Sequence, residues 1–235
     1  MGKPEDFLLP PFFEYFATFL WAVSGALLGA RKGYAVLGIL TLSMVSAAGG
    51  GLLRDGLFLQ QGPPQLVRTP YYLLIVGGAV ILVMFFGKWV MRVPRYDTIM
   101  ETVDALGLGA YAVVGMNRAL AAGISLPGVV VVGMVNAVGG GILRDILIRR
   151  DPKMFQPGTI EESAALAGCL FFLVLNQNPF WPLAPYPSAI TTISAVFLLR
   201  LLAIRYRIQV HPLKDFERYW KENQENQPSV KMPGE

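Results

Sequence analysis

The sequence contains two nearly identical stretches, Ala47-Ala48-Gly49-Gly50-Gly51-Leu52-Leu53-Arg54-Asp55 and Ala137-Val138-Gly139-Gly140-Gly141-Ile142-Leu143-Arg144-Asp145. Each places three glycines inside a long apolar run and follows them, after two aliphatic residues, with an adjacent Arg and Asp. A glycine lowers helix stability by roughly 1 kcal/mol relative to alanine, so we expect a membrane-spanning helix to bend or open there. Backbone that opens within a membrane must face a cavity or other protein, because lipid offers it no hydrogen bonds.

The two stretches lie 90 residues apart, and the match continues beyond them. At the same offset four further glycines correspond: Gly25 to Gly115, Gly33 to Gly123, Gly38 to Gly128, and Gly78 to Gly168. This correspondence predicts an internal duplication of the chain.

The composition indicates an integral membrane protein. Hydrophobic residues make up 54% of the chain and charged residues 15%, whereas charged residues are about a quarter of an ordinary soluble domain. The net charge of +4 is concentrated in a few loops and near the C-terminal end. We therefore interpret it as a signal of membrane orientation and not of nucleic-acid binding.

The apolar segments predict an all-α polytopic protein with seven transmembrane helices, at about residues 12–30, 34–60, 71–86, 102–120, 126–148, 163–175 and 188–204. A repeat of three spans crosses the membrane an odd number of times, so the second repeat enters from the opposite side. The expected organisation is an N-terminal segment (1–11), repeat 1 (12–87), a basic connector (88–101), repeat 2 (102–176), a loop (177–187), a seventh helix (188–205) and a polar tail (206–235).

The distribution of Lys and Arg predicts the orientation. The loops of one side hold Arg31, Lys32, Lys88, Arg92, Arg95, Arg149, Arg150, Lys153, Arg205 and Arg207. The loops of the other side hold only Lys3, Arg68 and Arg118. Because cytoplasmic loops carry the excess of Lys and Arg, we expect the N-terminus outside and the C-terminus in the cytoplasm.

Two three-span repeats plus one helix, with Gly-Gly-Gly-x-x-Arg-Asp in the second and fifth spans, resemble the trimeric intracellular cation (TRIC) channel family, specifically its prokaryotic members. The resemblance implies a homotrimer in the cell membrane, with a potassium-permeable pore in each subunit lined by kinked second and fifth helices. One departure is that Tyr34-Ala35-Val36-Leu37-Gly38 lacks the acidic residue that many relatives have at the start of the second span.

Some prokaryotic relatives carry the same repeat domain under a label of small-amino-acid (glycine) transport. A glycine-like solute carrier is therefore an alternative to the channel, because inverted repeats with broken helices serve both functions. A non-conducting membrane scaffold is a third possibility.

The glycine triplets are the candidate ion path. A cation that leaves water needs replacement oxygen ligands, and backbone carbonyls freed at the triplets would supply them. Polar residues on the preceding turns add further ligands. The candidate pore residues are Gly49, Gly50, Gly51, Gly139, Gly140, Gly141, Ser43, Ser46 and Asn136. The alternatives are close helix packing for the glycines and interhelical hydrogen bonds for Ser46 and Asn136.

Four charged groups beside the triplets, Arg54, Asp55, Arg144 and Asp145, have three interpretations. They form salt-bridged struts between the repeats, polar residues at the pore mouths, or gating elements. Glu101 and Asp104 lie one helical turn apart near the start of the fourth span, where they would draw cations into a vestibule or simply interact with the helix N-terminus.

The sequence offers no support for an enzyme. It has no phosphate-binding loop with Lys and Ser or Thr, no HExxH motif and no nucleophile elbow. The single His211 lacks a second ligand at metal-binding spacing. We expect no metal site and no cofactor, only permeant potassium or sodium ions.

Overall fold

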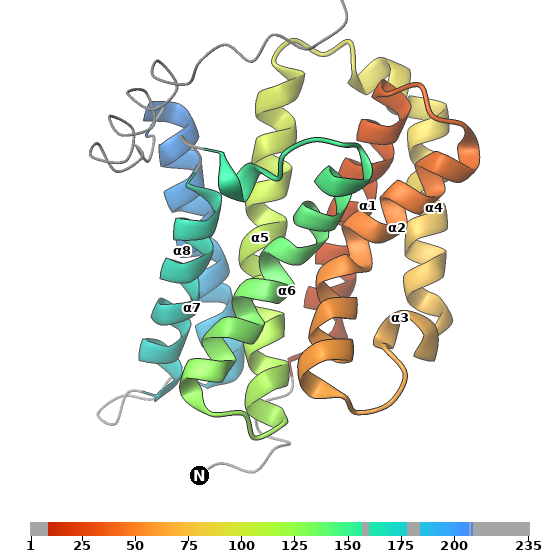
Figure 1. Ribbon diagram of the computed structural model, residues 1–235. Coiled ribbons are helices and arrows are strands. Elements are labelled where there is room, and N and C mark those ends of the chain that lie inside the picture. The colour runs from red at the N-terminus through yellow and green to blue at the C-terminus, as the bar shows by residue number, and fades with distance from the viewer. Residues whose placement is uncertain (1–8, 157–159, 178–183, 207, 209–235) are drawn as a thin grey trace, which may run out of the picture.

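The chain is described by a computed structural model covering residues 9–156, 160–177, 184–206 and 208 (Figure 1). The described residues contain helices and no strand. In chain order the elements are α1 (Pro11–Arg31), α2 (Val36–Leu53), the π-helix η2 (Arg54–Leu59), α3 (Gln65–Arg68), α4 (Pro70–Val90), α5 (Tyr96–Ala121), α6 (Leu126–Leu147), the short 3₁₀ helix η3 (Lys153–Phe155), α7 (Glu161–Gln177) and α8 (Pro185–Tyr206).

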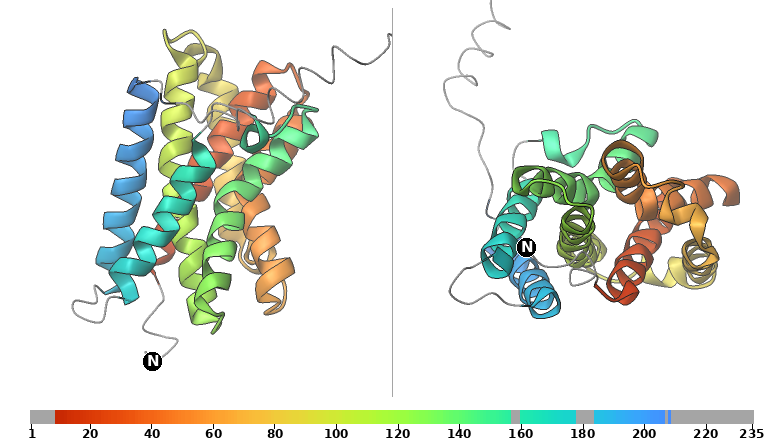
Figure 2. Two further views of the ribbon diagram at one scale, coloured as in Figure 1. Left: turned by 60° about the vertical axis from the view of Figure 1, so that its left-hand side comes forward. Right: turned by 90° about the horizontal axis from the view of Figure 1, so that it is seen from below.

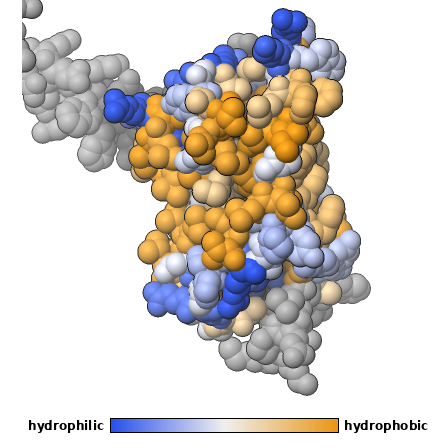
Figure 3. All heavy atoms as spheres, turned by 90° about the vertical axis from the view of Figure 1, so that its right-hand side faces the viewer, coloured by the Kyte–Doolittle hydropathy of each residue, from blue (hydrophilic) through white to orange (hydrophobic). Residues whose placement is uncertain are grey.

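Six of these helical segments are long and apolar enough to cross a membrane, namely α1, α2 together with η2, α4, α5, α6 and α8. The helix α7 is apolar but shorter. The surface agrees with a membrane protein, because a hydrophobic zone separates two ends where hydrophilic residues gather (Figure 3). The chain is an integral membrane protein.

The turn after α1 recurs after α5. Gly33 and Gly123 both have positive φ angles, of 72° and 74°, which glycine adopts without a steric penalty. In each turn the residue after the glycine donates a backbone hydrogen bond to the preceding helix, from Tyr34 to Gly29 and from Ile124 to Ala119, both at 3.1 Å. The two turns, which lie 90 residues apart, thus have the same local structure.

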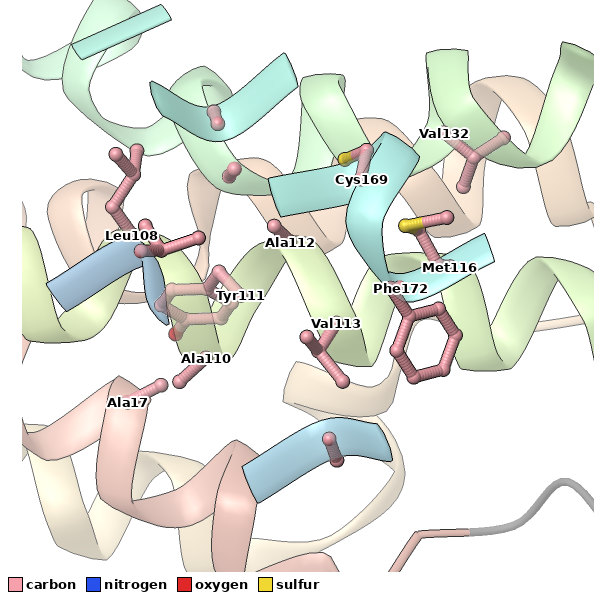
Figure 4. Packing of buried hydrophobic residues seen from close by; sticks show 14 of the residues in the cluster. Ala17, Leu108, Ala110, Tyr111, Ala112, Val113, Met116, Val132, Cys169 and Phe172 are labelled. Carbon is pink, nitrogen blue, oxygen red and sulfur yellow. The ribbon is translucent and has the colours of Figure 1, made fainter. Parts of the chain in front are cut away.

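The helices form one bundle with α5 and α6 at its centre (Figures 1 and 2). On one side of this pair lie α7 and α8, and on the other α1, α2 and α4. The largest buried cluster surrounds α5, where Tyr111, Val113 and Met116 pack with Cys169 and Phe172 of α7 (Figure 4). In Figure 1, α2 runs downward and α6 upward, so the helices that carry the two glycine triplets are antiparallel.

The glycine triplets do not interrupt their helices. Helical structure continues through Gly49–Gly51 in α2 and through Gly139–Gly141 in α6. The expected opening of the backbone at the glycines is therefore wrong for these helices, whereas a bend of the helix axis there stays a prediction. The irregular backbone instead begins at Arg54, with the π-helix η2.

Two further features differ from the expected organisation. The helix α5 begins at Tyr96, inside the segment expected to be a connector and before the expected start of the fourth span at Thr102. The short helix α3 interrupts the loop between the second and third spans. Most of the expected N-terminal segment, the centre of the 177–187 loop and nearly all of the polar tail lie outside the described residues.

Candidate functional site

The two glycine triplets face each other where α2 crosses α6. A β-carbon placed on Gly50 would collide with the carbonyl oxygen of Asn136, and one on Gly140 would collide with that of Ser46. A β-carbon on Gly49 would lie 3.1 Å from the Cα of Gly140. Side chains as small as hydrogen let helix backbones approach this closely. The middle glycines thus serve close contact between the helices within one subunit.

Three buried polar residues near the crossing form hydrogen bonds. Ser43 donates from its hydroxyl to the carbonyl of Ala22 in α1, at 2.8 Å. Asn136 donates from Nδ2 to the carbonyl of Tyr111 in α5, at 2.6 Å. Ser46 bonds within its own helix, to the carbonyl of Leu42 at 2.7 Å. Asn136 therefore joins two helices, as the hydrogen-bond interpretation expects, whereas the bond of Ser46 stays within α2 and does not. Ser43, for which no such bond was expected, also joins two helices. Pore lining by these residues stays a prediction.

The first charged cluster surrounds Arg54, whose side chain is 1% exposed. Its Nε lies 2.7 Å from Asp55 Oδ1 and its Nη2 lies 3.2 Å from Glu14 Oε1. Arg118 reaches the other oxygen of Glu14, with Nη2 at 2.7 Å from Oε2. A further bond from Arg54 Nη1 to Asn136 Oδ1, at 3.4 Å, crosses to α6. The buried cation Arg54 is thus paired with two carboxylates, as burial of charge requires.

The second charged cluster surrounds Arg144 and is looser. Its Nε lies 3.5 Å from Asp145 Oδ1 and its Nη1 lies 3.9 Å from Asp104 Oδ2. Ser24 of α1 links the cluster, because its hydroxyl accepts from Arg144 Nη1 at 3.2 Å and donates to Asp104 Oδ1 at 2.9 Å. The guanidinium carbon also lies 5.8 Å from the ring centroid of Trp21, within the range of a cation–π contact.

Both clusters connect segments of the chain that lie far apart. Arg54 joins α1 and α6, and Arg144 joins α1 and α5. This arrangement fits the strut interpretation of the two Arg-Asp pairs. The pore-mouth and gating interpretations stay predictions.

Each cluster borders a small cavity, and the two cavities correspond to each other at the 90-residue offset. The first has a volume of about 20 Å³ and the second about 30 Å³. Nine positions of the first lining have their counterpart in the second: Glu14/Asp104, Thr18/Leu108, Ala48/Val138, Gly51/Gly141, Leu52/Ile142, Arg54/Arg144, Asp55/Asp145, Tyr72/Glu162 and Tyr111/Trp21. Such volumes hold about one or two waters.

An aromatic pair contributes one residue to each cavity lining. The rings of Trp21 and Tyr111 meet edge to face with centroids 5.9 Å apart. The Tyr111 hydroxyl lies 3.1 Å from that of Thr18 and donates to the carbonyl of Ala47, one turn before the end of the first triplet. The aromatic pair and the glycine crossing therefore lie between the two charged clusters.

A larger cavity of about 250 Å³ adjoins the second cluster and shares Asp104, Arg144 and Asp145 with the small one. Glu101 also lines it, so both predicted vestibule acids border the same space. At its rim Arg31 pairs with Asp97 at 2.6 Å.

Sequence reasoning missed Glu14, Trp21 and Tyr111. Glu14 lies in the first turn of α1, and its partner Arg54 is 40 residues away. The signal that would have found it is the repeat itself, since Glu14 and Asp104 are two acids 90 residues apart, at the offset of the two Arg-Asp pairs.

The sequence matches the model of a family described as "Glycine transporter" over residues 11–88 and 101–177. It is 36% identical over 167 residues to a UPF0126 membrane protein of Deinococcus radiodurans, and the matched region covers 71% of this chain and 72% of that protein. It is 29% identical to the UPF0126 inner membrane protein YadS of Escherichia coli, with 82% of this chain and 90% of that protein covered.

Among solved structures, the fold is similar to the TRIC trimeric intracellular cation channel orthologue from Rhodobacter sphaeroides. The TM-score is 0.75 and the identity 29%, with 84% of this chain and 97% of that chain covered. A second solved structure, which concerns conductance through TRIC cation channels, matches with a TM-score of 0.75 and 28% identity. The match covers 88% of this chain and 98% of that chain.

Proposed function

Since this chain belongs to the family whose model is described as "Glycine transporter" and which includes the TRIC channels, we propose that it is a channel for monovalent cations, permeable to potassium. The observation that carries the proposal is the pair of corresponding cavities on the two sides of the glycine crossing within one subunit. The relatives point to a channel and not to an enzyme, in agreement with the motifs that the sequence lacks.

The ion path leads through the two cavities and along the α2–α6 crossing. Carboxylates line both cavities, from Glu14 and Asp55 in the first and from Asp104 and Asp145 in the second. These oxygens replace water around a cation and offset the charge of the neighbouring arginines. The glycine carbonyls stay within helical segments, so side-chain oxygens are the principal ligands, and Gly51 and Gly141 contribute to the walls.

In the described conformation the proposed path is narrow where α2 crosses α6. Each small cavity has room for about one or two waters, and the backbones of α2 and α6 touch between them. Conduction requires these helices to separate at the crossing, by bending at the triplets. Glycine suits this role because it adds no side chain to the contact and resists bending less than alanine does.

We further propose the assembly and orientation. Three subunits associate, each with its own path, and α7 completes seven spans arranged as two inverted repeats and a final helix. The names of the matched structures support a trimer. The lysines and arginines support an outer N-terminus and a cytoplasmic C-terminus in a prokaryotic cell membrane. The lipid bilayer and the permeant ions are the other partners, and no cofactor takes part.

A second candidate function is a carrier for glycine or a similar small amino acid. The description of the family model favours it. The second cluster also offers both a guanidinium, from Arg144, and a carboxylate, from Asp104, beside a cavity of about 250 Å³. Such a pair complements the two charges of an amino acid.

Recording from the purified protein in planar bilayers tests the proposal. A channel gives unitary currents in potassium that disappear when N-methylglucamine, a cation too large for the path, replaces it. Silent bilayers together with saturable glycine uptake into proteoliposomes would favour the carrier. A protein that shows neither is a scaffold, and the proposed function is then wrong.

A further inference from the structure

One basic residue of the first charged cluster has no charged counterpart in the second cluster. Arg118 binds Glu14 in the first cluster, but the position 90 residues earlier is Leu28. The first cluster therefore contains two carboxylates and two guanidinium groups, from Glu14, Asp55, Arg54 and Arg118, and is neutral. In the second cluster Arg144 faces both Asp104 and Asp145, and the position that corresponds to Arg118 holds an uncharged leucine.

Arg118 approaches Glu14 from the end of the bundle. It lies in the last turn of α5, and its side chain is 31% exposed, whereas that of Glu14 is 8% exposed. The guanidinium thus stands between the carboxylate and the solution. An ion pair that is partly in contact with water is weak and is screened by salt, so dissolved cations compete with Arg118 for this carboxylate.

Asp104 borders a larger cavity than Glu14 does and lies farther from its basic partner. Its nearest basic atom, Arg144 Nη1, is 3.9 Å away, compared with 2.7 Å between Arg118 and Glu14. The cavity of about 250 Å³ opens onto Asp104, and Leu28 lines the same cavity. A partly hydrated cation therefore has space beside Asp104, where no guanidinium among the described residues lies as close as Arg118 does to Glu14.

We infer that Arg118 is a tethered cation that occupies the position of a permeant ion beside Glu14 and makes the two ends of the path unequal. A monovalent cation binds beside Asp104 without competition, and beside Glu14 only when it displaces Arg118. This inference rests on the proposed function, because it names the regulation of the same path.

The repeat supplies the test variants. Arg118→Leu installs the residue found at the corresponding position of the first repeat, and Leu28→Arg transfers the cation to the Asp104 side. Arg118→Gln is a second, polar replacement in case the leucine variant does not fold. Arg118→Lys keeps the charge. Arg68→Leu is the control: it removes an arginine from the short helix α3 at the same end, where the side chain bonds to the carbonyl of Gln61 at 2.9 Å.

The primary measurement is the thermal stability of the purified protein as potassium replaces N-methylglucamine at constant ionic strength. Binding of an ion to the folded protein raises the melting temperature. We expect Arg118→Leu and Arg118→Gln to lower the half-saturating potassium concentration about three- to fivefold. This change in affinity corresponds to the interaction energy of a partly exposed ion pair. Arg118→Lys and Arg68→Leu should match the wild type, and Leu28→Arg should raise the half-saturating concentration.

Equal potassium responses in Arg118→Leu, Arg118→Gln and Arg68→Leu would overturn the inference. Because the melting measurement needs no conduction, its outcome is separate from that of the channel proposal. Silent bilayers with the expected shift would reject the channel and retain the tethered cation. Potassium currents without any shift would reject the tethered cation alone.

Discussion

Alanine substitution within one glycine triplet separates close helix contact from flexibility. The perturbation is a single methyl group placed at Gly50 or at its neighbour Gly51. At Gly50 the methyl collides with the carbonyl oxygen and carbon of Asn136, which belong to the α6 backbone. At Gly51 the nearest atom is Arg54 Nη2, at 3.8 Å, which is ordinary contact distance. The two variants thus make the same Gly-to-Ala change and differ only in whether the added methyl group collides with the backbone of α6.

The expected effects have opposite signs. Alanine gains about 1 kcal/mol of helix propensity over glycine at either position. At Gly50 this gain is opposed by overpacking, which costs about 1–3 kcal/mol and more when the obstacle is backbone that cannot rotate away. We therefore expect Gly50→Ala to lose about 2 kcal/mol and Gly51→Ala to gain up to about 1 kcal/mol. With about 2–4 °C per kcal/mol for a chain of this length, Gly50→Ala melts about 4–8 °C lower.

Thermal unfolding in detergent, with conductance measured on the same preparations, provides the assay. The second triplet is an internal repeat of the experiment, because Gly140→Ala meets the carbonyl of Ser46, whereas Gly141→Ala meets only the Trp21 ring at 3.4 Å. The contradicting result is that Gly50→Ala and Gly140→Ala are stabilised as much as Gly51→Ala and Gly141→Ala. In that case the α2–α6 contact does not limit the size of these residues.

Three further predictions follow from the charges and the assembly. Glu14→Gln leaves Arg54 and Arg118 with one carboxylate fewer and should lower the free energy of unfolding by about 3 kcal/mol. The control Asp97→Asn removes a carboxylate from the exposed pair with Arg31 and should leave the melting temperature unchanged. Equal losses of stability in the two variants would show that burial of the ion pair does not matter here. Cysteine labelling should find residues 62–69 accessible from outside and Asp151 from inside, and the reverse pattern would overturn the proposed orientation. Crosslinking in mild detergent should stop at three subunits, and a dimer in several detergents would contradict the trimer.

Much of the membrane architecture was predictable because it depends on local composition. The long apolar runs predicted the segments that form α1, α2, α4, α5, α6 and α8. The start of α5 was not predictable in this way, because residues 96–101 are largely polar and extend the helix beyond its apolar part. The π-helix η2 has no local signal either, because Leu53 to Leu59 differs little in composition from an ordinary helix end.

The glycine triplets show where local reasoning fails. Helix propensity predicted open backbone at Gly49–Gly51, but a penalty of about 1 kcal/mol per residue is small against the packing of two helices along their length. The same packing brings Glu14 to Arg54 and Arg118, which lie 40 and 104 residues away. Contacts at such separations follow from tertiary structure, and only the 90-residue repeat offered a sequence signal for them.

Block by silver ions tests most directly whether cations pass through both small cavities. Thr18→Cys and Leu108→Cys place a thiol at corresponding positions of the two linings. The native Cys169 is replaced by alanine, and Leu74→Cys on an exposed face of α4 serves as the control. A silver ion is small, monovalent and binds thiolate. We expect silver to abolish the potassium current of both cavity variants and to spare Leu74→Cys. Full current in silver-treated Thr18→Cys and Leu108→Cys channels would contradict a path through these cavities.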